Sequence, residues 1–269
     1  MALSVNTNMM ALNTQRALSG TQSGLATAME RLSSGLRVNS AKDDAAGLAI
    51  ASRMDAQVRG MSVAIRNAGD AISLAQTAEG GLNEITNMLQ RMRELAVQSA
   101  NATNSATDRL NLDAEYQALD AEITRQIGAT KFNGNAIIGA NAGAQVFQVG
   151  ANATDTISVT TTDLTGFMTA GDVTSDVNAT AAIGTIDAAL DVVTTNRATY
   201  GAVQNRFQSV VANLEVAREN QTAARGRIMD ADFAMETANL TRFQILQQAG
   251  TAMLSQANQA PQAVLGLLR

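Results

Sequence analysis

The chain has 269 residues, a net charge of −5 and a pI near 4.8, and this acidic balance argues against a nucleic-acid-binding protein, which needs a basic face. It contains no His, Cys or Trp, which excludes a Ser-His-Asp triad, an HExxH zinc site and a disulfide framework. No apolar run approaches the ~20 residues that span a bilayer, and the N-terminus lacks the pattern of a secretory signal, so we expect no membrane insertion.

The apolar content indicates long helices. Hydrophobic residues make up 46% of the chain, whereas aromatic residues make up only 3%, and Pro261 is the single proline. Ala and Leu are strong helix formers, and a chain without internal proline can form uninterrupted helices.

The first predicted helix covers about residues 4–33. Leu18, Leu25 and Leu32 recur every seven residues, and Gly35 is suited to end the helix in a left-handed conformation. The more polar residues 34–56 are predicted to form an extended connector that leads into a short helix.

The strongest pattern predicts a second helix over about 57–100. Its apolar residues alternate in steps of three and four, as in a coiled coil. They are Val58, Met61, Ile65, Ala68, Ile72 and Ala75, followed by Ala78, Leu82, Ile85, Leu89, Met92 and Ala96. Two consecutive steps of three at 72–75–78 predict a slip in the apolar seam.

The middle of the chain changes its period. Turn residues at 101–108 precede a predicted helix over about 105–129, and the stretch 131–135 is predicted to be a turn. Residues 145–161 contain two β-branched runs around "GANATD", which predicts a β-hairpin. The polar residues 162–180 are predicted to be a surface loop.

Helical spacing returns in the last third. A helix is predicted over about 180–222, then a polar joint at 219–227, then a last helix from about 229. The two long helices can pair antiparallel, so the predicted fold is mainly α, with long antiparallel coiled-coil helices and a small β-hairpin region in the centre. The chain ends on Val264, Leu265, Leu267 and Leu268, whose exposure to water invites association.

Three long stretches resemble bacterial flagellin. They are "ALNTQRALSGTQSGLATAMERLSSGLRVNSAKDDAAGLAIASRM" (11–54), "GLNEITNMLQRMRELAVQSANATN" (81–104) and "RIMDADFAMETANLTRFQILQQAGTAMLSQANQAPQAVLGLLR" (227–269). The resemblance implies a short flagellin without the outer variable domains. It further implies an inner filament core of terminal helices (1–33 and 230–269), a connector or spoke region (34–56) and a rod domain (57–229) with its hairpin and loop at about 131–180.

The resemblance also implies a function. It implies that this chain is not an enzyme: flagellins are exported unfolded, polymerise at the distal tip into the extracellular flagellar filament, and give swimming motility. The implied partners are further copies of the chain, the flagellin export chaperone, the flagellar type III export apparatus, and the filament cap and hook–filament junction proteins. Two alternatives are a hook–filament junction protein and a secreted monomeric effector.

Certain residues match positions through which flagellins are recognised by immune receptors. Arg91, Leu95 and Glu115 match positions bound by Toll-like receptor 5, although the two charges can instead be solvated or contact other subunits, and Leu95 can be a packing residue. The four apolar residues of the tail, named above, match those read by cytosolic inflammasome receptors and the export chaperone. Polymer packing is the simpler interpretation of the tail.

Family members often carry O-linked sugars on exposed hydroxyl groups. The candidates in this chain are Thr160, Thr161, Thr162, Thr165 and Ser175, and the alternative is an unmodified polar loop.

Overall fold

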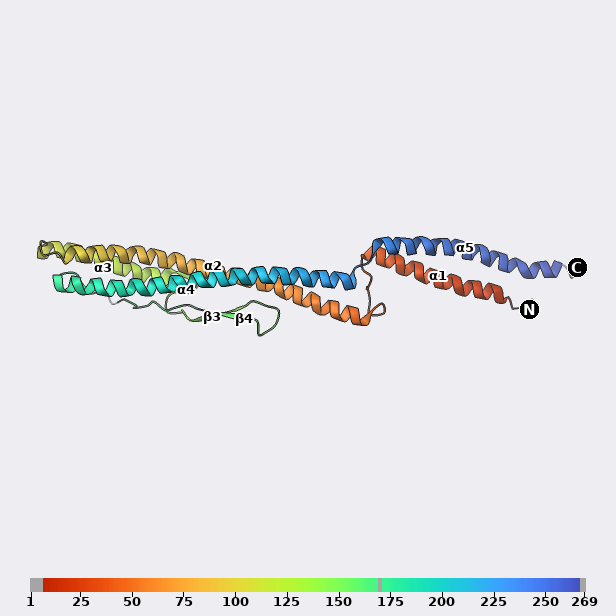
Figure 1. Ribbon diagram of the computed structural model, residues 1–269, viewed down its shortest axis with the longest axis horizontal. Coiled ribbons are helices and arrows are strands. Elements are labelled where there is room, and N and C mark those ends of the chain that lie inside the picture. The colour runs from red at the N-terminus through yellow and green to blue at the C-terminus, as the bar shows by residue number, and fades with distance from the viewer. Residues whose placement is uncertain (1–6, 169–170, 267–269) are drawn as a thin grey trace. The chain divides into compact units, whose positions relative to one another are not determined.

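The computed structural model describes residues 7–168 and 171–266 (Figure 1). It forms two compact units, Met1–Asp55 with Asn220–Arg269, and Ala56–Glu219. The elements are α1 (Met9–Ser34), α2 (Ala45–Ser99), α3 (Ala106–Ala129), β1 (Lys131–Phe132), β2 (Asn135–Ala136), β3 (Ala144–Gln148), β4 (Thr156–Thr160), α4 (Asp176–Met229) and α5 (Phe233–Gly266). The predicted fold, mainly α with a small β region in the centre, is confirmed. Among the described residues, no helix is both long and apolar enough to cross a membrane.

Helices α2 and α4 run antiparallel in the unit of residues 56–219. Near the end of α2, Arg93 Nε lies 2.6 Å from Asp187 Oδ1. Earlier in α2, Glu79 accepts a hydrogen bond of 2.9 Å from Gln204, which lies later in α4. Residue numbers therefore fall along one helix as they rise along the other, as the sequence predicted.

The apolar seam of α2, meaning its row of buried positions, has no slip. The buried side chains follow unbroken steps of three and four, with Leu74 beside the row. They are Met61, Ala64, Ala68, Ala71, Ala75, Ala78, Leu82, Ile85, Leu89, Met92, Ala96 and Ser99. Two positions of the predicted seam, Ile65 and Ile72, are wrong, because both isoleucines are only half-buried and the neighbouring alanines lie inside. Small side chains at these positions let the packed backbones approach closely.

A second row on α2 lies beside this seam. Leu74, Gly81, Met88 and Leu95 recur every seven residues beside the seam, and all but the half-buried Met88 are buried. A Cβ atom added to Gly81 would lie 2.6 Å from Oγ1 of Thr130, the residue that follows α3. Helix α2 therefore contributes to a three-helix core with both α3 and α4.

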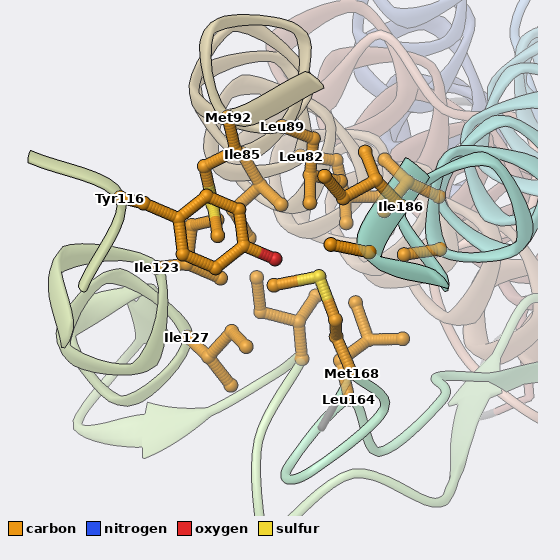
Figure 2. Close-up of a cluster of buried hydrophobic side chains, with 14 of the residues drawn as sticks. Leu82, Ile85, Leu89, Met92, Tyr116, Ile123, Ile127, Leu164, Met168 and Ile186 are labelled. Atoms are coloured by element: carbon orange, nitrogen blue, oxygen red, sulfur yellow. The ribbon is translucent and has the colours of Figure 1, made fainter. Parts of the chain in front are cut away.

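Tyr116 of α3 lies in the middle of that core (Figure 2). Its side chain is fully buried among leucine, isoleucine and methionine side chains, and Figure 2 shows its hydroxyl group pointing into the cluster. This oxygen has no hydrogen-bond partner among the described residues. Burial, and then the nearby carboxylates of Asp120 and Asp113, raise the pKa of Tyr116 to about 12.

The central strands form two hairpins. The predicted turn at 131–135 is a small hairpin, in which β1 and β2 flank Asn133 (φ 50°) and Gly134 (φ 85°), both in the left-handed region. The predicted hairpin in 145–161 is confirmed as β3 paired antiparallel with β4. Phe147 of β3 meets Phe207 of α4 edge to face, with ring centroids 5.7 Å apart, and this contact anchors the second hairpin on the helix.

Two places where the sequence predicts an interruption between helices are themselves helical. The predicted short helix before residue 57 and the long helix after it are one helix, α2, which begins at Ala45. The predicted polar joint at 219–227 is the last part of α4. Its Gln, Ala and Arg residues are good helix formers, so a polar stretch continues the helix without a break. Helix α4 also begins earlier than predicted, after Ser175, whose hydroxyl group accepts a hydrogen bond from the Asn178 amide.

The N- and C-terminal parts of the chain are joined by backbone hydrogen bonds in their own unit. Gly35 ends α1 with φ 71°, as predicted, and its carbonyl accepts a hydrogen bond from Ala231. The Arg37 amide donates to the Met229 carbonyl at 2.6 Å. Beside this bridge, Val38, Ala51 and Met229 form a small buried core. The prediction that residues 34–56 form a separate connector region stays a prediction.

Candidate functional site

Helices α1 and α5 form an antiparallel pair (Figure 1). Near the start of α1, the side-chain amide of Asn8 donates to the carbonyl of Ala257 at 2.8 Å. At the other end of the pair, Arg31 Nη1 lies 3.0 Å from Glu236 Oε1. These two contacts fix the direction and register of the helices.

A buried carboxylate strengthens the second contact. Glu236 is only 7% exposed and also accepts a hydrogen bond of 2.9 Å from Asn239. The hydrogen bond from Asn239, and then that from Arg31, hold the pKa of Glu236 below its usual range. Because Glu236 lies in the first turn of α5, its negative charge also interacts favourably with the helix dipole.

The helix pair leaves many of its apolar side chains exposed to water. Among the described side chains of the two helices, only Ala28, Glu236 and Ala257 are buried. Nine of these described side chains are large, apolar and exposed: Met9, Met10, Leu12, Met29, Phe233, Met235, Ile245, Leu246 and Met253. The exposed fraction reaches 69% at Met9 and 64% at Met235. An exposed apolar surface of this kind is typical of an interaction site.

The residues proposed for receptor recognition occupy different environments. Arg91 and Glu115 lie side by side on the surface, with 2.8 Å between Arg91 Nη2 and Glu115 Oε1. Glu94 also contacts Arg91, at 3.0 Å. Leu95, in contrast, is fully buried in the core between the helices. The structure thus brings the two charges together and gives Leu95 the packing role that the sequence left open.

The structure describes only part of the apolar tail. Val264 and Leu265 belong to the last turn of α5, of which only the backbone is described. Leu267 and Leu268 lie outside the described residues.

The O-glycosylation candidates divide by exposure. Thr160, Thr162 and Thr165 are exposed. Thr161 is only 3% exposed, and its hydroxyl group exchanges hydrogen bonds with the backbone of Gly143, so its proposal as an exposed acceptor is wrong for this fold. Ser175 is half-buried and its hydroxyl group caps α4.

The contact of Arg31 with Glu236 leaves no signal in the sequence. The two residues are 205 positions apart, and nothing in the local pattern pairs them. The sequence shows where the methionines of α1 and α5 lie, but it does not show that they are exposed. Their exposure arises because these two helices make few contacts.

Two family models match the chain. One describes the bacterial flagellin N-terminal helical region and matches residues 5–143, and the other describes the bacterial flagellin C-terminal helical region and matches residues 183–268.

The chain belongs to the bacterial flagellin family.

Relatives and solved structures agree with this assignment. A flagellin of Halalkalibacterium halodurans is 48% identical over 270 residues, which cover 98% of this chain and 99% of the relative. Flagellin B of Vibrio cholerae is 35% identical over 375 aligned positions and is covered completely, so it contains segments that this shorter flagellin lacks. The crystal structure of Bacillus cereus flagellin superimposes with a TM-score of 0.52 at 35% identity, covering 55% of this chain and 88% of that one.

Proposed function

We propose that this flagellin is the structural subunit of a bacterial flagellar filament and thereby serves swimming motility. The exposed apolar surface of the α1–α5 pair carries the proposal, because it is the part of the described molecule that most needs a partner. Flagellin is a family of structural proteins, which agrees with the expectation that the chain is not an enzyme.

The energetics favour assembly through the terminal helices. Full burial of a large apolar side chain contributes roughly 1.5–3 kcal/mol, whereas ordering each residue of a helix costs about 1–2 kcal/mol of backbone entropy. A two-helix pair that buries so few side chains gains little to offset this cost. Neighbouring copies supply the missing contacts, and a head-to-tail contact that does not close produces a helical filament.

The wider partners follow from the same proposal. The chain is secreted to the extracellular filament by the flagellar type III export apparatus, after binding the export chaperone through its C-terminal residues. It then meets the filament cap and junction proteins. A chain with one proline and no cysteine suits this route, since refolding at the tip meets no disulfide step and little slow proline isomerisation.

Recognition by Toll-like receptor 5 rests on the surface pair of Arg91 and Glu115. Both side chains are about half exposed and therefore accessible in the free subunit. Leu95 supports the pair from inside the core. The four apolar tail residues Val264, Leu265, Leu267 and Leu268 are the proposed contacts of inflammasome receptors.

Elongation of filament fragments tests the proposal. We expect purified full-length chain to extend short flagellar fragments under the electron microscope, and a chain without residues 258–269 to remain monomeric. A point variant tests the helix pair itself: Ile245→Asn, at a side chain that is 61% exposed, should slow elongation. Val177→Asn is the matched control, because Val177 is 72% exposed in the other unit, in the first turn of α4.

Each other result has a clear meaning. Equal growth of the full and truncated chains would leave a filament subunit whose tail is not needed for assembly. Failure of the full chain to grow would overturn the filament proposal and favour the junction protein or the monomeric effector.

A further inference from the structure

Methionine is unevenly distributed over the exposed apolar side chains. Of the nine on α1 and α5, five are methionine: Met9, Met10, Met29, Met235 and Met253. None of the eight exposed large apolar side chains elsewhere in the described chain is methionine. Six of them are valines in the unit of residues 56–219, and the other two are Leu110 and Ile50. The five methionines, here called the methionine set, thus lie entirely on the helix pair.

Methionine can be oxidised where other aliphatic side chains cannot. Its thioether sulfur attacks an oxygen of a peroxide, so that an S–O bond forms while the O–O bond breaks. The sulfur loses two electrons and becomes a sulfoxide, and hydrogen peroxide is reduced to water. The product replaces a flexible apolar side chain with a polar one and disrupts methionine-rich interfaces.

We propose that the methionine set is an oxidation site that controls self-association, with hydrogen peroxide as the oxidant. This inference rests on the proposed filament function. The free subunit presents all five thioethers to solvent, with exposed fractions from 50% at Met29 to 69% at Met9. The subunit is therefore sensitive before assembly, and assembly through the same surface protects it.

The other described methionines provide the internal comparison. Met92 is fully buried, Met168 is 8% exposed, and Met61 and Met229 are each 9% exposed. Met54 and Met88 are half-buried. Peroxide should therefore modify the methionine set first and leave the cores of the subunit intact.

Sulfoxides at the methionine set should oppose burial between subunits. Each sulfoxide oxygen needs a hydrogen-bond donor once water is removed. A single unpaired buried polar group costs roughly a 5- to 150-fold change in affinity, and the methionine set has five such positions. We expect oxidised subunits to need at least about a tenfold higher concentration to elongate filament fragments.

The experiment treats full-length monomer with hydrogen peroxide, stops the reaction with free methionine, and maps added oxygen by peptide mass spectrometry. Elongation of filament fragments is then followed by light scattering. A variant with all five residues of the methionine set changed to leucine should elongate equally well before and after peroxide, because leucine has nearly the volume of methionine and no sulfur. The control variant Met54→Leu with Met88→Leu should stay as sensitive as the unchanged chain.

Two further measurements sharpen the test. Reduction of oxidised monomer by methionine sulfoxide reductases for both sulfoxide epimers should restore elongation. Filaments treated with peroxide should gain less oxygen at the methionine set than monomers do.

Several outcomes would overturn the inference. One is normal elongation by a monomer whose methionine set is oxidised; another is equal inhibition of the five-leucine variant. Oxidation of Met92 as fast as Met9 would contradict the order of accessibility. If the untreated chain does not elongate filament fragments, the proposed filament function is wrong. If it elongates them at the same rate with and without peroxide treatment, only the proposed oxidation site is wrong.

Discussion

Two adjacent glycines in α2, Gly80 and Gly81, should respond in opposite ways to replacement by alanine: one variant should be more stable than the unchanged chain, and the other less stable. Gly80 is exposed, and a Cβ atom added there would have no neighbour within 4 Å. Gly81 is buried, and its added Cβ would lie 2.6 Å from Thr130 Oγ1 and 2.8 Å from Thr130 Cγ2. Both positions are inside a helix, so both changes to alanine gain the same intrinsic propensity.

The magnitudes follow from this contrast. Alanine is favoured over glycine in a helix by about 1 kcal/mol, so Gly80→Ala should raise the free energy of unfolding by up to that amount. Gly81→Ala gains the same but adds an overpacking cost of about 1–3 kcal/mol. Thr130 cannot easily yield, because its hydroxyl group donates to Gln126 O at 2.8 Å and its carbonyl accepts from Ile137 at 3.2 Å. The two variants should differ by about 1–3 kcal/mol.

Urea unfolding followed by circular dichroism measures the difference. The double variant Gly81→Ala with Thr130→Ala should recover part of the loss, because it removes both close atoms of Thr130 and leaves Cβ at 3.2 Å. If Gly81→Ala is as stable as Gly80→Ala, then Thr130 moves aside at no cost, and the argued packing between α2 and the end of α3 is wrong.

Two further variants test buried polar groups. Tyr116→Phe removes a buried hydroxyl group that has no partner among the described residues, so the free energy of unfolding in urea should rise by about 1 kcal/mol. A lower free energy of unfolding would show that the oxygen is hydrogen-bonded. The lowered pKa of Glu236 means that its contribution is fully present above its unfolded pKa of about 4.3 and is lost as the pH falls through the lower folded value. Helicity of the α1–α5 pair should therefore fall on acidification by more in the unchanged chain than in Glu236→Gln, and identical acid titrations would contradict this role.

The sequence predicted the helices better than their contacts. Leu82, Ile85 and Leu89 were placed correctly in the seam, because steps of three and four leave one face of a helix for a partner. In the N-terminal half of the predicted seam, Met61, Ala68 and Ala75 are correct, whereas Ile65 and Ile72 are each misplaced by one position. Hydrophobicity favours the larger side chain, whereas close packing of two helices favours the neighbouring Ala64 and Ala71.

The candidate sites show the same limit. Arg91 and Leu95 are four residues apart and thus on one side of α2, yet one is exposed and the other is fully buried. The difference arises because Leu95 packs into the core with α3, while Arg91 contacts Glu115 at the outer edge of that helix. Only the pairing of helices distant in sequence reveals which positions a neighbour covers.

The antiparallel arrangement also orders the long-range contacts by their distance along the chain. Ser99 bonds to Val173 across 74 residues, Arg93 to Asp187 across 94, and Gln204 to Glu79 across 125. In the other unit, Asn8 bonds to Ala257 across 249 residues. Along the sequence, each contact encloses the one before it, so the contacts between nearer residues can form first and the contacts between more distant residues afterwards. The entropy of loop closure grows only with the logarithm of length, and a loop already closed by inner contacts leaves little more to close at each step. A long chain can thus pair its most distant segments without a costly search between its two ends.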